Sequence, residues 1–363
     1  MSERVTIKSI AQDLGLSHMT VSRALAGHAN VHPETRKAVL DRASALGYVK
    51  SAAASAMRGD ATRIVGLLLP NLVNEFYAQF ADTMARACQA QALHLVIHLT
   101  NDDEANERQA IMRLREVQAS AVVMVPTPST GLTPPASVEG MRVVQLIRHR
   151  DPAPALLIDD APAIADAVDR LVDRGHRDIG FIGADLQLSS GRERLAAFRA
   201  ALQRRGLFPR DSLTITGAPS FQLGYDGARA LLDGQAGMTA LVCGGFEISN
   251  GALEACLERG LKFPEDLALV GYGDPSAYRW IAGGITTVRL PVAEMAIAAV
   301  RSSSESPLQS QEPSSPMMFP ATLVRRRSTG RCCRTSSAES FGILDRHRLH
   351  PRRLRLGRGR PSA

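Results

Sequence analysis

Short apolar runs alternate with amphipathic segments along most of the chain after residue 62. The runs read RIVGLLL, LHLVIHL, AVVMV, VVQLI, ALLI, DIGFIG, LTIT, ALVC and LALVGY. Apolar residues recur with helical periodicity between most of them, in residues 75–92, 104–117, 162–174, 192–205, 223–233 and 248–259. Such alternation is typical of parallel sheets covered by helices on both faces. Roughly ten strands suit two sheets better than one, so we expect an α/β region of two doubly wound parallel-sheet subdomains.

Residues 6–47 follow a different pattern, which predicts a small all-α unit of three short helices. Thr6, Ser17 and Pro33 suit the starts of the helices, and Gly15 and Gly47 can end the first and the third. The apolar positions expected to face inward are Ile7, Ile10, Ala11, Leu14, Val21, Leu25, Ala38, Val39, Ala43 and Leu46. The turn between the first two helices is about four residues long, which is helix-turn-helix spacing.

Three further segments follow neither pattern. Residues 48–62 are rich in small residues, and their Ala-rich run of about eight residues is too short for a stable helix in water. Residues 301–316 are rich in Ser and Pro and are expected to be disordered, whereas FPATLVRRRSTG returns to a strand-like pattern. Residues 331–363 match no recognisable pattern, for which we consider two explanations. They are a disordered basic arm that would add nonspecific affinity for DNA, or they result from an out-of-register reading of the gene. We therefore predict a headpiece (1–49), a linker (50–62), an α/β region (63–330) and a disordered basic tail (331–363).

The net charge of +7 and the pI near 9.5 do not by themselves indicate a nucleic-acid partner. Residues 331–363 hold nine Arg against one Glu and one Asp, so the rest of the chain sums to zero. Residues 1–60 hold eight Lys or Arg against five acidic residues. The argument for DNA binding must therefore come from the headpiece rather than from the composition.

Membrane, metal and cofactor sites are not predicted. No apolar run approaches the roughly 18 residues of a membrane span, and MSERVTIKSI lacks an apolar signal stretch, so we expect a cytoplasmic protein. The five cysteines match no zinc spacing. We expect Cys88, Cys243 and Cys256 to be reduced core thiols, and Cys332 and Cys333 to be exposed.

The second headpiece helix carries a polar row on the face opposite its buried residues. With Val21 and Leu25 inward, the residues that lie outward are Ser17, His18, Met19, Ser22 and Arg23. A helix fits the major groove of DNA, where such a row can contact base edges. Arg23 can donate to guanine O6 and N7, or otherwise to a phosphate. The alternative is an ordinary solvated face on a small helical bundle.

The headpiece resembles that of the lactose/galactose-repressor family of transcriptional regulators. VTIKSIAQDLGLSHMTVSRALAG and VHPETRKAVLDRASALGY carry the I-A-x-x-L-G-L-S-x-x-T-V-S-R and T-R-x-x-V-x-x-A-x-x-L-G-Y spacings. Later matches are RIVGLLLP, DRGHRDIGFIG, RERLAAF, ERGLKFPEDLALVGYGD, GGITTVRLPVAEM and FPATLVRRRSTG. The resemblance covers residues 4–300 and 318–330, and M-T-V-S-R is similar to the gluconate-repressor branch.

The resemblance implies a homodimer that binds double-stranded DNA at a pseudo-palindromic operator. His18 and Met19 occupy positions that vary with operator sequence in the family, so they resemble specificity determinants. Short polar side chains that suit phosphate oxygens would set the register without reading sequence. These residues are Thr6, Ser17, Thr20, Asn30 and Thr35.

The linker resembles the hinge helix of the family, which folds in the minor groove at the operator centre. Ala54 and Met57 match the small residue and the apolar wedge, and a wedge between base steps would kink the DNA. Lys50 and Ser51 stand where the family usually has Pro-Asn, and Met57 stands where leucine is usual. A plain flexible linker is the alternative.

The resemblance further implies that the α/β region is similar to periplasmic sugar-binding proteins, with a small-molecule effector between its subdomains. Ligands of such folds lie outside the carboxyl ends of the strands. The residues expected to contact the effector are Asn71, Asn74, Phe76, Arg148, Arg194, Phe221, Phe246, Glu247 and Asp274.

Two of these positions depart from the sugar-binding pattern. Arg148 stands where many relatives hold Asp, and Gly245-Phe246 where many hold Asn-Asp. Arg148 and Arg194 together would favour an anion, because Arg binds a carboxylate through two parallel hydrogen bonds. Our hypothesis is an anionic sugar derivative such as a sugar acid. The alternative is that Arg148 is a surface residue in the basic run RHR.

The first helix of the α/β region is a candidate dimer contact by analogy with the family. Its polar positions are Glu75, Gln79, Thr83 and Arg86, while Phe80, Met84 and Ala87 could equally belong to the core. The C-terminus has no heptad repeat of the kind that forms tetramers in some relatives.

Two other classes of function compete with a ligand-regulated transcription factor. For an enzyme we would expect a catalytic or phosphate-binding motif, but no G-x-S-x-G, G-x-x-x-x-G-K-[ST] or strand-linked G-x-G-x-x-G is present. His176 could in principle act as a catalytic base, but we expect it to pack or hydrogen-bond locally. A solute-binding protein for transport would need export, for which the N-terminus carries no signal. The sequence therefore favours a repressor-like regulator that is not an enzyme.

Overall fold

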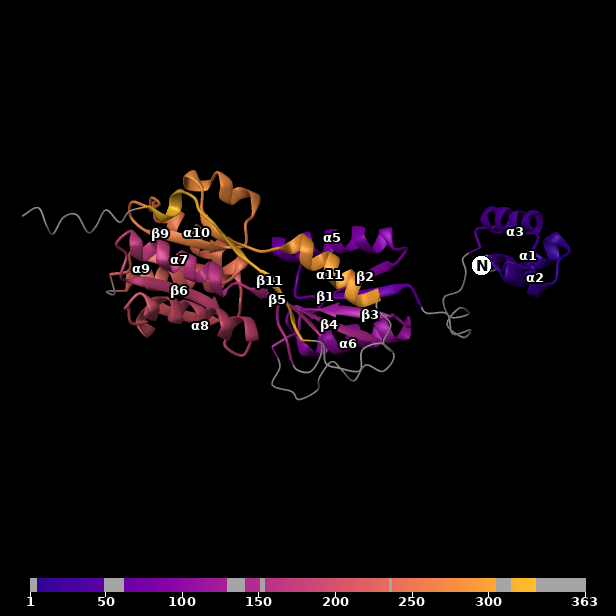
Figure 1. Cartoon of the computed structure of the whole chain (residues 1–363), viewed down its shortest axis with the longest axis horizontal. Coiled ribbons are helices and arrows are strands. Elements are labelled where there is room, and N and C mark those ends of the chain that lie inside the picture. Colours follow the sequence, from indigo (N-terminus) through magenta and orange to yellow (C-terminus); the bar gives the residue numbers. More distant parts are fainter. Residues whose placement is uncertain are drawn as a thin grey trace, which may run out of the picture. The chain divides into compact units, whose positions relative to one another are not determined.

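The computed structural model describes residues 5–48, 62–128, 141–150, 154–234, 237–304 and 315–330. Figure 1 shows the helical headpiece and the α/β elements that follow it. The chain divides into two compact units. Unit 1 comprises Met1–Ile158 and Pro291–Phe319, and unit 2 comprises Asp159–Leu290 and Pro320–Ala363.

The described headpiece contains the expected helices α1 (Ile7–Leu14), α2 (His18–Leu25) and α3 (Pro33–Ala45). Thr6 caps α1 and exchanges hydrogen bonds with Ser9, and Gly15 ends the helix at a φ of 63°, a left-handed conformation that glycine adopts at little cost. Pro33 opens α3, as expected. The buried core of the headpiece consists of Ile10, Ala11, Val21, Ala24, Val31, Val39 and Ala43.

One inward-facing prediction for the headpiece is corrected by the structure. Ala38 is exposed, because α3 buries only the stripe of Val39 and Ala43, which are one turn apart on the same face. Leu25 packs against the core as predicted and is half-buried, while the neighbouring Ala24 is fully buried. The small size of Ala24 lets α2 approach its neighbours closely.

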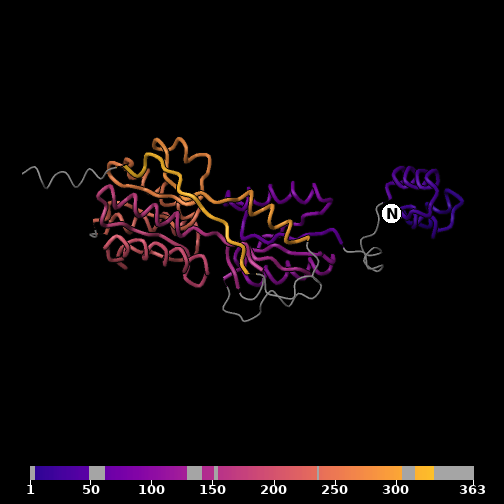
Figure 2. The backbone as a smooth tube through the Cα atoms, viewed as in Figure 1, coloured from indigo at the N-terminus to yellow at the C-terminus, as the bar shows by residue number. Residues whose placement is uncertain are grey.

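Unit 1 holds a six-stranded sheet within its described residues, in the order β11-β5-β4-β3-β1-β2. The strands are β1 (Ile64–Leu69), β2 (His94–Leu99), β3 (Ala121–Met124), β4 (Arg142–Leu146), β5 (Ala155–Asp159) and β11 (Met317–Pro320). Its helices are α5 (Glu75–Ala90), α6 (Glu104–Glu116) and α11 (Val292–Ser304). Figures 1 and 2 show α11 beside α5 on one face of the sheet, although about 200 residues separate them, and α6 on the other face.

Unit 2 repeats this arrangement in its described residues, with the strand order β12-β10-β9-β8-β6-β7. The strands are β6 (Ile179–Ala184), β7 (Thr214–Gly217), β8 (Ala240–Cys243), β9 (Ala268–Tyr272), β10 (Thr286–Arg289) and β12 (Thr322–Val324). Its helices are α7 (Ala161–Asp173), α8 (Ser189–Arg204), α9 (Phe221–Asp233) and α10 (Phe246–Glu258), with short turns η2 (Asp211–Leu213), η3 (Ser276–Arg279), η4 (Ile281–Gly283) and η6 (Arg327–Thr329). In each sheet the first strand lies between the second and the third, so the predicted doubly wound fold is confirmed.

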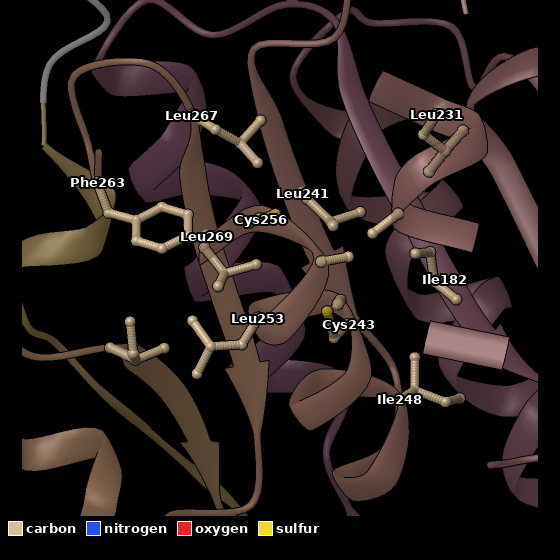
Figure 3. Close-up of a cluster of buried hydrophobic side chains, with 14 of the residues drawn as sticks. Ile182, Leu231, Leu241, Cys243, Ile248, Leu253, Cys256, Phe263, Leu267 and Leu269 are labelled. Carbon is tan, nitrogen blue, oxygen red and sulfur yellow. The ribbon is translucent and has the colours of Figure 1, made fainter. Parts of the chain in front are cut away.

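The core of unit 2 lies between its sheet and the helices α9 and α10 (Figure 3). Ile182, Leu241 and Leu269 project from the strands towards Leu253 and Cys256 of α10. Burial raises the pKa of the Cys243 and Cys256 thiols to about 12. Together with buried Cys88 these thiols are free, as predicted.

Helices α9 and α10 pack at close range through two glycines. A Cβ atom at Gly224 would lie 2.0 Å from the backbone oxygen of Ile248, and one at Gly251 would lie 2.0 Å from that of Phe221. Neither position can accept a side chain unless the two helix backbones move apart.

Part of the segment that we expected to be disordered is ordered. Helix α11 continues through Ser304, and β11 begins at Met317, so only residues 305–314 of that segment lie outside the described residues. Ser303 and Ser304 donate to the carbonyl oxygens of Ala299 and Val300. This back-bonding satisfies both hydroxyls and lets serine occupy the last turn of a helix. The predicted linker and tail also lie outside the described residues, and no described helix is long and apolar enough to cross a membrane.

Candidate DNA-binding and effector sites

Helix α2 presents the predicted row of side chains to solvent. Ser17 caps the helix by accepting a hydrogen bond from Thr20 N at 3.0 Å, and the two hydroxyls lie 2.9 Å apart. His18, Met19 and Arg23 are exposed, with 53% of Met19 accessible. These side chains are therefore accessible to a partner.

The remaining headpiece candidates have different surroundings. Thr6 is occupied in the cap of α1, Ser22 and Thr35 are half-buried, and Asn30 is exposed in the loop between α2 and α3. Sequence reasoning missed Arg36, whose Nη2 donates to His28 O at 2.5 Å and so ties α3 to that loop. The predicted hinge residues Ala54 and Met57 lie outside the described residues.

The loop after β1 uses its asparagines for capping. Asn71 Oδ1 accepts from Asn74 N, and Asn74 Oδ1 accepts from Phe76 N, both at 3.0 Å. Phe76 is only 5% exposed, and its ring lies against those of Tyr77 and Phe80. The structure therefore places Phe76 in the core of unit 1 rather than on a ligand-facing wall.

Arg148 is buried at the carboxyl edge of the unit 1 sheet, so it is not a surface residue of the run RHR. Its Nη1 and Nη2 donate to the two carboxylate oxygens of Asp102 at 2.5 and 3.2 Å, and Nη1 also donates to Pro126 O. The preceding Ile147 has a φ of 64° and Asp102 a φ of 55°. A β-branched residue such as Ile147 rarely adopts this left-handed conformation, whereas Asp adopts it more readily, so the ion pair joins a strained turn to the loop of Asp102.

Arg194 occupies a comparable position in unit 2. Its Nε donates to Asp160 Oδ2 at 2.6 Å, and its Nη1 donates to Gly244 O at 3.2 Å. Its guanidinium also covers the ring of Tyr272, and Ser190, buried one turn earlier, lies on the same face of α8. Sequence reasoning missed Asp102, Asp160, Ser190 and Tyr272.

The two phenylalanines of unit 2 each open a helix. Phe221 is half-buried at the start of α9, with its ring stacked on that of Tyr225. Phe246 is 9% exposed at the start of α10 and packs against Gly273. Burial raises the pKa of the neighbouring Glu247, which is half-buried. Phe221 and Glu247 remain accessible to a ligand, whereas Phe246 is mostly covered.

Asp274 is held between two arginines. Its carboxylate pairs with Arg289 at 2.6 Å and with Arg326 at 2.7 Å, and its side chain is 7% exposed. Burial would raise the pKa of Asp274, but the two guanidinium groups hold it below its ordinary value. The residue therefore tethers the end of β10 to the segment after β12.

His176 behaves as predicted, since it hydrogen-bonds locally. Its Nδ1 lies 3.1 Å from Thr239 Oγ1 and its Nε2 3.5 Å from Gly330 O, and the ring is 1% exposed. Burial lowers its pKa. A ring so enclosed has no access to a substrate.

Comparison with known proteins agrees with this arrangement. A family model of bacterial regulatory proteins of the lacI family matches residues 6–51, and one of a periplasmic binding protein-like domain matches residues 168–329. The chain belongs to the LacI family of transcriptional regulators. The first match covers the headpiece and the second covers unit 2 from α7 to η6.

Relatives of this LacI-family regulator align along most of its length. It is 26% identical over 333 residues to catabolite control protein A of Priestia megaterium, covering 90% of this chain and 99% of that protein. It is 27% identical over 334 residues to the transcriptional regulator GalS of Salmonella typhimurium, covering 89% and 96%. The solved lac repressor dimer bound to operator and the anti-inducer ONPF shares the fold, with a TM-score of 0.77 and 21% identity over 90% of this chain and all of the other.

Proposed function

We propose that this LacI-family regulator is a repressor that binds a pseudo-palindromic operator as a homodimer and responds to a small metabolite. The observation that carries the proposal is the exposed polar row of α2, which lies within the residues matched by the lacI-family model. Capping by Ser17 and packing of Val21 and Ala24 fix the orientation of α2, so that its outer face can enter a major groove.

In this proposal the headpiece contacts divide into two groups. His18, Met19, Ser22 and Arg23 face base edges, where Arg23 donates to guanine. Thr6, Ser17, Thr20, Asn30 and Thr35 face phosphates and fix the register. Ala54 and Met57 enter the minor groove at the operator centre and kink the DNA.

The dimer is proposed to form partly through unit 1. The polar residues Gln79 and Arg86 are exposed on α5, whereas Phe80 and Met84 are buried in the core and are unavailable for an interface. The edge strand β2 also exposes 39% of Ile97 and 46% of Leu99. An exposed apolar edge strand is a site at which a second chain can pack.

The proposed effector is an anionic sugar derivative. Arg148 and Arg194 stand at the carboxyl edges of their sheets, each with a carboxylate partner, Asp102 or Asp160. A sugar acid has a carboxylate, which accepts hydrogen bonds from guanidinium groups, and hydroxyls, which donate to carboxylates. It can therefore bind to both members of an Arg–Asp pair. If the effector binds one conformational state of the regulator more tightly than the other by 1–3 kcal/mol, it would change the affinity for DNA by roughly 5–150-fold.

The proposal is tested by selecting bound fragments from the native genome with the full-length chain, followed by gel shifts on the selected DNA. We expect an inverted-repeat site and strong loss of binding when residues 1–60 are removed. Equal affinity and selectivity without those residues would contradict the assignment of the headpiece. Calorimetry with D-gluconate and neutral sugars tests the effector class, and binding of neutral sugars alone would exclude an acid.

A further inference from the structure

Among the residues of unit 2 that the structure describes, nine arginines are paired with a carboxylate. The pairs are Arg194–Asp160, Arg199–Asp211, Arg204–Asp169, Arg205–Asp173, Arg210–Asp178, Arg259–Asp233, Arg289–Asp274, Arg326–Asp274 and Arg327–Glu265. In contrast, Arg170, Arg174 and Arg325 form no ion pair with any residue that the structure describes. These three residues therefore retain their charge for an external partner.

Arg170 is held in a fixed orientation. It is half-buried on α7, and its Nε donates to Thr329 Oγ1 at 2.6 Å. Thr329 is fully buried, and its hydroxyl lies 2.9 Å from that of buried Thr286. The Nη1 and Nη2 groups of Arg170 have no hydrogen-bond partner in the described part of the chain. A buried hydroxyl thus orients a guanidinium group whose two terminal donors remain available.

Arg174 and Arg325 bring two further charges to the same place. Arg174 is the C-cap residue of α7 and follows Arg170 by four residues. Arg325 comes directly after β12, which packs against α7, and precedes Thr329 by four residues. Burial and the like charges of Arg174 and Arg325 lower the pKa of Arg170.

The C-terminal end of helix α7 offsets only part of the positive charge of these arginines. The C-terminal end of a helix carries roughly half a negative charge, which favours nearby cations. Arg177 already donates to Val172 O and His176 O at that end of the helix. Asp166 lies one turn before Arg170, yet forms no ion pair with any described arginine. The remaining excess of positive charge is suited to an anion with more than one negative charge.

We propose that Arg170, Arg174 and Arg325 form a binding site for a phosphate group, supplied either as free phosphate or as a phosphomonoester. Guanidinium groups bind phosphate oxygens through paired hydrogen bonds, and a dianion suits a cluster of several cations. Helix α7 leads into β6, so its last turn lies at the amino-terminal end of the unit 2 sheet. Arg194 lies at the opposite, carboxyl edge, so the phosphate site is distinct from the proposed effector site.

The test is calorimetric titration of the full-length chain with sodium phosphate at low ionic strength. We expect one site per chain and a rise in the thermal unfolding midpoint with phosphate. The double substitution Arg174→Ala and Arg325→Ala is expected to weaken binding about tenfold or more, since two charge-assisted contacts are lost. Arg170 is left intact because it also holds Thr329 in place.

The matched control is Arg279→Ala, which removes an exposed arginine of the same unit that forms no ion pair among the described residues. It should change the dissociation constant less than twofold. The proposal is overturned by absence of phosphate binding, by binding that survives the double substitution, or by equal loss in Arg279→Ala. Titration with D-glucose 6-phosphate and D-glucose identifies the source, because a phosphomonoester site binds the first more tightly than phosphate and ignores the second.

Discussion

The guanidinium group of Arg194 lies over the ring of Tyr272, with 4.2 Å between Cζ and the ring centroid. The hydroxyl of Tyr272 donates to Asp160 Oδ2 at 2.6 Å, and Arg194 Nε donates to the same oxygen at 2.6 Å. All three side chains are buried. Tyr272 thus contacts both members of the ion pair, through its ring face and its hydroxyl, and limits the orientations open to Arg194.

Substitution of Tyr272 by Phe should separate these two contacts. The ring remains over Arg194, but the hydrogen bond to a buried carboxylate is lost, which we expect to reduce the free energy of unfolding by about 1.5–3 kcal/mol. Urea unfolding measures the change. Tyr225→Phe is the matched control, because the hydroxyl of Tyr225 donates to the exposed Glu258 and should contribute less than about 1 kcal/mol. Equal losses in the two variants would refute a special role for the buried hydroxyl.

Asp274→Asn should break an ion triad in which Asp274 is buried, Arg326 is mostly buried and Arg289 is exposed. Arg326 would lose its carboxylate partner in the interior, and such a loss costs about 3–5 kcal/mol at pH 7. Thermal or urea unfolding measures this loss. In Asp211→Asn, the control, the carboxylate is 91% exposed, so a change below about 1 kcal/mol is expected.

The stability that Asp274 contributes should depend on pH in a defined direction. Its folded pKa lies below its ordinary value of 3.8, so the unfolded chain binds the proton more readily. The contribution is complete above pH 3.8 and is lost as pH falls through the lower folded value. Unfolding free energies measured between pH 6 and pH 2 should therefore fall less steeply for Asp274→Asn than for the wild-type chain. If the unfolding free energies of the variant and the wild-type chain fell in parallel with pH, Asp274 would not be the group responsible for the loss of stability in acid.

Arg23→Ala distinguishes between base and phosphate contacts. If Arg23 reads a guanine, discrimination against a changed base pair should fall by about 1–3 kcal/mol with little change at other positions. If it contacts a phosphate, affinity should fall on all sequences and the salt slope should decrease by about one. Competition gel shifts at several salt concentrations measure both quantities. Arg115→Ala on α6, which also removes one exposed positive charge, should leave the sequence preference intact.

Gly224→Ala should destabilise unit 2 more than Gly227→Ala on the same helix. The new methyl group at residue 224 would meet the backbone of Ile248, and overpacking of this kind costs about 3 kcal/mol. At residue 227 the nearest atom, at 3.2 Å, belongs to the flexible side chain of Ile182. Alanine gains about 1 kcal/mol over glycine in a helix, which should offset most of that contact. Similar unfolding midpoints for the two variants would contradict the close helix packing.

The succession of strands and helices could be predicted because each apolar run is bounded by an amphipathic segment. RIVGLLL and EFYAQFADTMARACQA became β1 and α5 at nearly the expected residues. Helices α8, α9 and α10 begin two or three residues earlier than expected, where small residues such as Ser189 and Gly191 are buried in or near the first turn. The end of α11 was missed because Ser303 and Ser304 satisfy their hydroxyls within the helix.

The candidate effector site was less predictable than the fold. Arg148, which follows the run VVQLI, and Arg194, in RERLAAF, were predicted from the family resemblance, but their carboxylate partners were not. Asp102 precedes Arg148 by 46 residues and Asp160 precedes Arg194 by 34, so no local spacing links them. A signal was nevertheless available, since Asp102 and Asp160 also come directly after apolar runs, where the fold gathers functional side chains.

β11 and β12 are the last strands of their sheets to be synthesised. The residues of β4 and β5 are made long before those of β11, which pairs with the free edge of β5. The residues of β10 are likewise made before those of β12, which pairs with β10. A ribosome must pass residue 320 before the unit 1 sheet gains β11, and residue 324 before the unit 2 sheet gains β12. Until then β5 and β10 each expose an unpaired backbone edge. Nascent chains that have passed β5 or β10 but not yet β11 or β12 are therefore open to wrong pairing with one another through these edges.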